Sequence, residues 1–399
     1  MPSDNVDKYD VLILSADFGK GHHQVSAALQ KVLSEERPHW DVAIHNYFKQ
    51  TFPLLNGLFI FFYCQLIRWF PFIYDWYYRI TDSKNPLSVW HRILSKIGSK
   101  KMLQLITHCS PRIIICTFPT PAGVISRLKE IGKIDISLAV VVTDVTSHSQ
   151  WIHKTADRYF LAANAPVASF LEKGVLEEKI QITGIPIRPQ FESPIPNPGF
   201  WLKHNLDPSI FTLLIMGGGR GMMPGVDKIC KRLAAMTLPM QIIALTGSNK
   251  ALAMKLKVIV RDSSIPIRVI DYVENIAPVM KGAHLLLSKA GGITVFEALA
   301  VKLPLLIYKP LPGHEMCNVR FLLENNAALK ADNVSQAVKL IKKAVKDPAL
   351  LRNISRAMGL LSRPSSAREV VKTIIDMVGN NNCGNPAETD SQTRKNLYA

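Results

Sequence analysis

The chain has 399 residues, of which 48% are hydrophobic and 20% are charged, and its formal net charge is +17. This length exceeds the size at which a single hydrophobic core stops growing, so two domains are expected. The composition is that of a folded protein and excludes a chain that is disordered throughout. The charge indicates a polyanionic partner, which is either a nucleic acid or a membrane surface with anionic lipids.

The N-terminal sequence MPSDNVDKYD is polar and acidic. It lacks the basic and apolar regions of a signal peptide. The six cysteines have no CxxC spacing, so they give no zinc signature, and their scatter suits a reducing compartment. We therefore expect a cytoplasmic protein in which residues 1–9 form a short leader.

The first half of the chain alternates apolar runs of strand length with helical patterns. The run Val11–Leu14 is followed by the glycine-containing loop Ser15–Gly21, and apolar residues then recur at helical spacing from His22 to about Leu33. Further strands are predicted at Val42–Ile44, Ile113–Cys116 and Leu138–Val142. This alternation predicts a Rossmann-like domain over residues 10–190.

The segment Phe52–Ile80 departs from that rhythm because it is long, aromatic and interrupted by Pro71. Its most apolar part, Leu54–Phe62, is too short to span a bilayer, and Gln65 and Arg68 interrupt any longer run. Two interpretations remain open from the pattern. The segment is either a helix buried in the core or a surface that contacts a membrane.

A proline-rich stretch at residues 185–198 predicts a stiff linker between domains. The alternation of strands and helices then resumes and predicts a second domain over residues 199–378, followed by a disordered polar tail at residues 379–399. Strands are expected at Phe211–Met216, Gln241–Leu245, Ile267–Ile270, Leu285–Ser288 and Leu305–Tyr308. The pattern predicts the α/β class, with parallel, doubly wound sheets that bind ligands at the carboxyl ends of their strands.

Three loops of the second half follow predicted strands and carry candidate binding residues. In Met216–Gly221 the glycines allow a phosphate to approach the backbone and Arg220 could neutralise it, although a tight glycine turn explains the sequence equally well. In Ser288–Glu297 the carboxylate of Glu297 could accept hydrogen bonds from a ribose, or it could cap the helix. The loop Tyr308–Asn318 carries polar groups that could bind sugar hydroxyls, or it is an ordinary surface loop.

The sequence SKAGGITVFEALAVKLPLLIYKPLPGHEMCN, residues 288–318, resembles the donor-binding signature of glycosyltransferase family 28. Within that family it is most similar to the diacylglycerol glycosyltransferases. Residues 15–23, SADFGKGHH, resemble the GxGH loop of the same branch, and the resemblance covers residues 9–346. It implies a GT-B fold, in which two Rossmann-like domains face a central cleft. The N-terminal domain would bind a lipid acceptor, and the C-terminal domain would bind a UDP-sugar.

The resemblance also implies roles for residues of the C-terminal domain. Glu297 would hold the ribose hydroxyls, and Val273 would offer backbone groups to uracil. The diphosphate would meet Gly291, Gly292 and Thr294, and Gly218, Gly219 and Arg220 would line the same site. The transferred sugar would be held by Glu315 and Asn318, with His314 beside them. His314 stands where these enzymes often have Gln, and Ala290 where the glucosyltransferases often have Pro, so glucose and galactose both remain open.

The N-terminal loop would carry the acid–base chemistry, because His22 and Asp17 match the family's positions for it. A lipid hydroxyl has a pKa far above 7, so its attack on a sugar requires a general base. Histidine, with an ordinary pKa of about 6.5, suits that role. The alternative is that His22 merely begins a helix after a glycine turn. We find no DxD-like metal motif, and the resemblance requires neither a metal ion nor another cofactor.

With this resemblance, the aromatic segment is expected to contact lipid headgroups through Phe61, Phe62, Arg68 and Trp69. The expected function is an inverting transfer of a hexose from UDP-glucose or UDP-galactose to diacylglycerol. The protein would bind peripherally to the inner face of the cell membrane, and anionic lipids would account for its charge. We find no RNP motif, helix-turn-helix signature or zinc finger, so no nucleic-acid partner is expected.

Two alternatives stay open. The chain could instead resemble the family 28 N-acetylglucosaminyltransferase of peptidoglycan synthesis, which acts on a polyprenyl-linked lipid, although the PGHE and GKGH sequences argue against this. It could also be a UDP-sugar sensor without catalytic activity.

Overall fold

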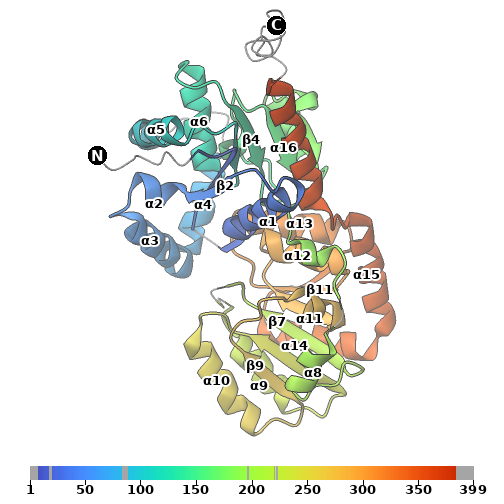
Figure 1. Cartoon of the computed structure of the whole chain (residues 1–399). Coiled ribbons are helices and arrows are strands. Elements are labelled where there is room, and N and C mark those ends of the chain that lie inside the picture. The colour runs from blue at the N-terminus through green and yellow to red at the C-terminus, as the bar shows by residue number, and fades with distance from the viewer. Residues whose placement is uncertain are drawn as a thin grey trace, which may run out of the picture.

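The computed structural model describes residues 8–17, 20–82, 89–195, 197–219, 221 and 223–382. Within them the chain forms two α/β domains, each built on a six-stranded parallel sheet with helices on both faces (Figure 1). The strands of the first sheet are β1 (Val11–Ser15), β2 (Val42–Asn46), β3 (Ile113–Cys116), β4 (Ser137–Val141), β5 (Arg158–Leu161) and β6 (Ile180–Ile182). Those of the second are β7 (Phe211–Met216), β8 (Met240–Leu245), β9 (Ile267–Ile270), β10 (Leu285–Ser288), β11 (Leu305–Tyr308) and β12 (Ala328–Ala331).

The order of strands places one topological switch point in each sheet. The first sheet has the order β2-β1-β3-β4-β5-β6 and reverses between β1 and β3, where Val11 lies opposite Ile113. The second has the order β12-β11-β10-β7-β8-β9 and reverses between β7 and β10, where Leu213 lies opposite Leu285. Ligands of doubly wound sheets bind beyond the carboxyl ends of the strands at such reversals. The loops that begin after these four strands are therefore the natural place for a site.

The central strands form because their sequences are continuously apolar, as strands covered by helices on both faces require. Every residue of β1, β3, β10 and β11 is buried. All nine strands predicted from the sequence are present. Three were missed, namely β5, β6 and β12, because they are three or four residues long and include polar side chains.

Helices connect the strands and cover both faces of each sheet. In the N-terminal part they are α1 (Lys20–Glu36), α2 (Tyr47–Thr51), α3 (Asn56–Trp69), α4 (Pro71–Thr81), α5 (Val89–Cys109), α6 (Pro119–Glu130) and α7 (Val167–Glu172). In the C-terminal part they are α8 (Pro198–Lys203), α9 (Val226–Ala234), α10 (Lys250–Arg261), α11 (Ala277–Gly282), α12 (Gly292–Val301), α13 (His314–Glu324), α14 (Val334–Lys346), α15 (Pro348–Leu361) and α16 (Ser366–Asn382). Short 3₁₀ turns lie at Ser149–Trp151, Glu177–Lys179 and Pro189–Phe191.

The proline-rich stretch and the last helix tie the two domains together. Ile185, Ile187 and Phe191 are buried in the core, so this connection is packed in place and is more than a spacer. The helix α16 packs against α1 of the first domain (Figure 1), and Arg368 of α16 forms ion pairs with glutamates of α1. The described part of α16 includes residues 379–382, so these residues are helical and not disordered as predicted. Residues 383–399 of the predicted tail, and residues 1–7 of the predicted leader, lie outside the described residues.

The aromatic segment forms two helices, α3 and α4, because Pro71 lacks a backbone N–H and begins a new helix at its first position. The core interpretation of this segment is wrong for its exposed aromatic rings, while Phe52, at its start, is partly buried against the core of the first domain. Phe61, Phe62 and Trp69 are 55%, 60% and 63% exposed. In the described part of the chain, no helix has the length and apolar character needed to cross a membrane.

Candidate active site between the two domains

His22 lies in the first turn of α1 and contacts the loop that follows β3. Its Nδ1 atom is 3.0 Å from the carbonyl oxygen of Thr117 and 3.0 Å from Oγ1 of Thr143. The contact arises from the fold, because β1 and β3 are neighbours at the switch point of the first sheet. A carbonyl oxygen only accepts, so the proton of the ring lies on Nδ1 and Nε2 keeps a lone pair. The His22 ring can therefore accept a proton at Nε2.

The surroundings of His22 keep it neutral. Burial, together with electrostatic repulsion from the neighbouring His314, lowers the pKa of His22 to about 4, and the Thr117 carbonyl acts in the opposite direction. Asp17, the other predicted acid–base residue, is exposed just after β1. Residues 18 and 19 of the same loop lie outside the described residues, so a partnership of Asp17 with His22 stays a prediction.

A loop of the N-terminal domain that sequence reasoning missed, Thr143–Thr146, joins the two domains. The side chain of Asp144 is buried, and its Oδ1 accepts a hydrogen bond of 2.8 Å from Nδ2 of Asn318. The backbone N–H of Val145 donates to Oδ1 of Asn318 at 2.8 Å, and Nδ2 of Asn318 also donates to the Ala290 carbonyl at 2.8 Å. The amide of Asn318 thus binds one loop of each domain at once.

Asp144 lies at the N-terminus of α12, where backbone N–H groups favour negative charge. Its Oδ1 atom lies beside Gly292, 3.0 Å from where a Cβ atom of that residue would be. Burial raises the pKa of this carboxyl, while His314, Asn318 and the Gly292 backbone act in the opposite direction. A Cβ atom on Gly292 would lie 2.2 Å from the Thr143 carbonyl oxygen, so only glycine admits the loop this closely. The glycines of the 288–297 motif therefore form an anion site that a carboxylate of the other domain occupies.

Glu297 is buried on α12 and pairs with Arg188 of the proline-rich connection. Its Oε1 atom is 2.8 Å from Nη2 and 3.2 Å from Nε of Arg188. Burial raises the pKa of Glu297, and the guanidinium of Arg188 acts in the opposite direction. The capping alternative is wrong, because the N-cap residue of α12 is Gly291 and has no side-chain hydrogen bond. A ribose that binds Glu297 must therefore share or displace Arg188.

The remaining predicted residues of the 308–318 loop connect neighbouring loops. Glu315 is buried, its Oε2 accepts a hydrogen bond of 2.6 Å from the Leu311 backbone, and its Oε1 is 3.3 Å from Nζ of Lys289. His314 is partly exposed at the start of α13, near enough to His22 and Asp144 to influence the pKa of both. The structure thus places His22, Asp144, His314, Glu315 and Asn318 around one junction.

Other residues that were predicted to bind the UDP-sugar lie at the edge of this junction. Gly218 has a φ of +69° and its carbonyl accepts a hydrogen bond of 2.8 Å from the Gly221 N–H, so these glycines form a tight turn, and their binding of a phosphate stays a prediction. Gly219, Val273 and Thr294 are partly exposed. Arg220 lies outside the described residues. Among the described residues, no group of three or more His, Cys, Asp and Glu side chains is placed to hold a metal ion.

Comparison with known proteins decides the family. A family model for monogalactosyldiacylglycerol (MGDG) synthase matches residues 22–187, and one for the glycosyltransferase family 28 C-terminal domain matches residues 212–372. A processive diacylglycerol beta-glucosyltransferase of Bacillus mycoides is 31% identical over 370 residues, which are 92% of this chain and 93% of that one. The chain belongs to the diacylglycerol glycosyltransferases of family 28.

Further comparisons agree with this assignment. The enzyme of the same name from Bacillus pumilus is 29% identical over 93% of this family 28 chain and 96% of its own length. Among solved structures, MurG of Acinetobacter baumannii has a TM-score of 0.62 at 14% identity and covers 92% of this chain and 99% of its own. HepE of Anabaena, solved with UDP and glucose, has a TM-score of 0.53 at 11% identity over 92% of this chain and 99% of its own. At these identities the structures show the fold alone, and the predicted GT-B fold is confirmed.

Proposed function

We propose that this protein transfers a hexose from a UDP-sugar to diacylglycerol and so makes a membrane glycolipid. Its relatives are named for this activity, and the chain matches almost their whole length. One observation of the structure carries the proposal furthest. A neutral histidine of the first domain with a lone pair on Nε2 lies at the same junction as the anion site of α12 in the second domain.

The donor is proposed to bind along α12. Its diphosphate would take the place of the Asp144 carboxylate at the Gly292 N–H, because a diphosphate carries more negative charge and more acceptor oxygens. Its ribose would bind Glu297, and its uracil would lie near Val273. The departing UDP would be stabilised by the N-terminus of α12 and by Lys289, and we propose no metal ion for this step.

The transfer itself is proposed to be a single displacement. The oxygen of the lipid hydroxyl forms a bond to the anomeric carbon while its proton passes to Nε2 of His22. The bond from the anomeric carbon to the phosphate oxygen breaks on the opposite face, and UDP leaves with the electron pair. Configuration at the anomeric carbon is inverted. Negative charge on the bound diphosphate would raise the pKa of His22 and make it a better base in the complex.

The low pKa of His22 gives a prediction for the pH dependence. Only neutral His22 can accept a proton, so activity falls as the pH falls through its pKa. Because that pKa is about 4, kcat/KM for the UDP-sugar should stay nearly constant between pH 7.5 and about pH 5.5. A pH series at saturating acceptor measures this, with circular dichroism to confirm folding. An acid limb near pH 6.5 would contradict the burial of His22.

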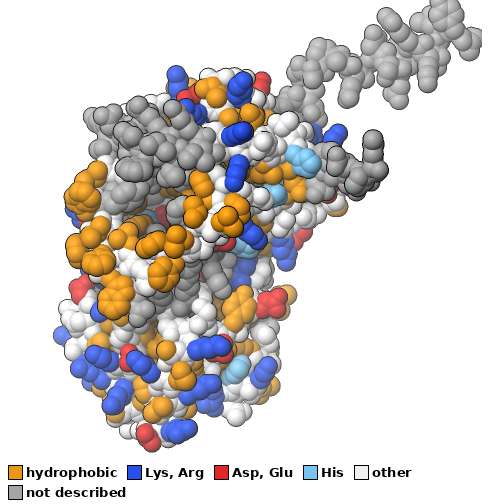
Figure 2. Space-filling model, turned by 90° about the vertical axis from the view of Figure 1, so that its left-hand side faces the viewer, with side chains coloured by type: hydrophobic (Ala, Val, Ile, Leu, Met, Phe, Trp, Pro, Cys, Tyr) orange, Lys and Arg blue, Asp and Glu red, His pale blue; other side chains and the backbone are white. Residues whose placement is uncertain are grey.

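The acceptor is proposed to reach the site from a membrane that binds α3 and α4. Figure 2 shows apolar side chains gathered on this side of the molecule. We call this group the α3–α4 apolar surface; its exposed members are Leu58, Phe61, Phe62, Trp69, Phe70, Phe72, Ile73, Trp76 and Ile80. Arg79 of α4 is 77% exposed beside them. Arg68, also predicted to contact lipid, has a side chain outside the described part. Aromatic rings with basic neighbours suit the headgroup region, so we propose peripheral binding to anionic lipids at the inner face of the cell membrane.

Binding to vesicles should have a salt-sensitive and a salt-resistant part. Substitution of Phe61, Phe62 and Trp69 by Ser should lower the salt-resistant fraction about tenfold or more, because apolar burial is not screened by ions. Sedimentation with phosphatidylglycerol vesicles at low and high salt measures both parts. A matched control replaces Leu202, Met254 and Val258, which are similarly exposed on α8 and α10, by Ser. Equal losses in the two triple variants would contradict the proposal.

The activity is tested with vesicles that contain diacylglycerol and a panel of UDP-sugars, with lipid products separated by chromatography. UDP-glucose and UDP-galactose are the first donors to compare, because the relatives are named glucosyltransferases while the N-terminal family model is that of a galactolipid synthase. A glycosylated diacylglycerol with either donor supports the proposal. Donor binding without any lipid product would favour a UDP-sugar sensor instead.

A further inference from the structure

The helix α4 has one face that is exposed to solvent and one that packs against other parts of the protein. Its outer face carries Phe72 and Trp76, which are 68% and 64% exposed and belong to the α3–α4 apolar surface. Its inner face carries Tyr74, Asp75 and Tyr78, which are only partly exposed. This inner face contacts the second domain, and the proposed function has so far given it no role.

Two residues of the inner face bind the start of α13 across the domain boundary. The hydroxyl of Tyr74 is 3.2 Å from Nδ1 of His314, and the two rings meet edge to face at 6.2 Å between centroids. Oδ1 of Asp75 accepts a hydrogen bond of 3.3 Å from the backbone N–H of Gly313. The other oxygen of Asp75 is 2.8 Å from Nε of Arg79 on the same helix, which fixes the carboxylate.

The loop before α13 is shaped to receive these side chains. Gly313 has a φ of +78°, a conformation that favours glycine. A Cβ atom there would lie 3.0 Å from Cε1 of Tyr74 and 3.1 Å from Cγ of Tyr78, so the two tyrosine rings pack directly on the backbone. The packing of Tyr74 and Tyr78 on this backbone therefore requires glycine at position 313, because its φ is positive and there is little room for a Cβ atom.

Asp75 also supplies a cap that α13 lacks. Gly313 is the N-cap residue of α13 and offers no side chain. In a capping box the third residue of the helix returns a carboxylate to the N–H of the N-cap residue, but here that position is Met316. The carboxylate of Asp75, from the other domain, takes this place. A negative charge at the N-terminus of a helix is also favoured by the helix dipole.

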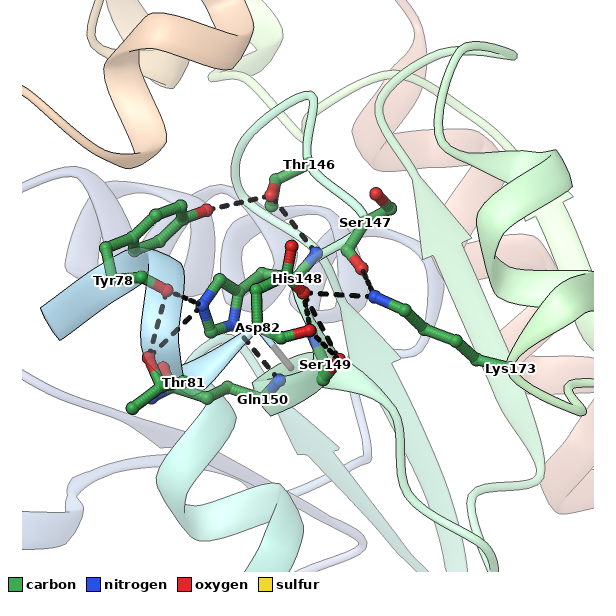
Figure 3. A network of polar contacts seen from close by, with 9 residues as sticks. All are labelled: Tyr78, Thr81, Asp82, Thr146, Ser147, His148, Ser149, Gln150 and Lys173. Carbon is green, nitrogen blue, oxygen red and sulfur yellow. Dashed lines mark hydrogen bonds and ion pairs between the residues drawn. The ribbon is translucent and has the colours of Figure 1, made fainter. Parts of the chain in front are cut away.

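The far end of α4 is fixed in its own domain, as Figure 3 shows. The hydroxyl of Tyr78 is 2.9 Å from Oγ1 of Thr146, and Nε2 of His148 is 2.7 Å from the Tyr78 carbonyl oxygen. Asp82 accepts a hydrogen bond of 2.9 Å from the Ser149 backbone and is 3.0 Å from Nζ of Lys173. The end of α4 is thus fixed in the first domain, while its inner face contacts the loop before α13.

We propose that Tyr74 and Asp75 are positioning residues of the donor site, which hold the His314 ring and the Gly313 backbone where the transferred sugar binds. This inference rests on the proposed function, because it takes His314 and its loop to contact the sugar. It adds that the helix with the apolar outer face also sets how tightly the hexose of the donor is held. The nucleotide part of the donor, at α12, is not touched by either residue.

The test compares UDP with UDP-glucose and UDP-galactose by calorimetry on the full chain. Tyr74→Phe keeps the ring but loses the hydroxyl, and should weaken the preferred UDP-hexose about threefold to tenfold while UDP stays within twofold. Asp75→Ala should act in the same direction, and Asp75→Asn, which keeps an acceptor oxygen, should restore most of the affinity. The matched control is Tyr159→Phe, which removes a hydroxyl that bonds to the His153 backbone within the first domain. It should leave the ratio of the two affinities unchanged.

A second measurement separates positioning from a general loss of structure. If Tyr74 acts through His314, Tyr74→Phe should have no further effect in a His314→Ala background. An undiminished effect in that background, or an equal loss of UDP and UDP-hexose affinity, would overturn the inference. A wild-type chain that binds UDP-hexose but glycosylates no lipid would refute the proposed transfer reaction while the affinity ratios still decide the role of Tyr74. A chain that binds no UDP-hexose would overturn both.

Discussion

His22→Ala is expected to lower kcat for transfer about 10²–10⁴-fold while the KM for the UDP-sugar changes little. A general base contributes about that much, and the imidazole acts on the acceptor hydroxyl and not on the bound nucleotide. The contacts of Nδ1 with Thr117 and Thr143 leave Nε2 as the only nitrogen that can take the proton. Initial rates with diacylglycerol vesicles and a range of donor concentrations measure both constants.

The matched control for this variant is His23→Ala. His23 is the next residue of α1 but is exposed, so its removal should leave kcat within about twofold. If His22→Ala keeps near-normal turnover in a folded protein, His22 is structural and the base must be sought elsewhere at the junction. Asp17→Asn tests the other predicted acid–base residue in the same assay.

Glu297→Ala is expected to weaken UDP binding roughly tenfold or more, since hydrogen bonds to a carboxylate contribute about 1.5–3 kcal/mol each. It should also lower the free energy of unfolding by about 3–5 kcal/mol, because it breaks a buried ion pair and leaves Arg188 without its partner. Calorimetry with UDP and urea denaturation measure the two effects.

Arg188→Ala separates those two effects. It breaks the same ion pair and leaves a carboxylate that is only 4% exposed, so it should destabilise the fold at least as much as Glu297→Ala. The carboxylate remains present for a ribose, so UDP affinity should stay within about threefold. If both variants lose UDP binding equally, the ion pair holds the fold and Glu297 does not contact the nucleotide.

The framework of the fold follows from local sequence. The nine predicted strands were found because long apolar runs alternate with helical patterns, and the glycine loops fall at strand ends where the switch points place them. β6 and β12 were missed because each is a short, partly polar strand at the edge of its sheet. The return of α16 to the first domain depends on packing against α1, which no local pattern reveals.

The site residues that were not predicted from the sequence were missed for a common reason. Asp144 follows an apolar strand in a short loop with no glycine motif, and Arg188 lies in a segment that looked like a linker. Tyr74 and Asp75 lie within a run whose aromatic composition indicated membrane contact. Each acquires its role only through contact with the opposite domain, with Asn318, Glu297 or the loop before α13. The one available signal was an acidic residue shortly after a predicted strand, namely Asp144 after Leu138–Val142.

A crystal structure of the chain with UDP bound tests most directly whether the donor binds between the two domains as proposed. We expect diphosphate oxygens within hydrogen-bond distance of the Gly292 N–H, with Asp144 displaced from it, and ribose hydroxyls on Glu297. UDP found elsewhere on the second domain, with Asp144 still beside Gly292 and Arg188 still bound to Glu297, would contradict the assignment of the donor site.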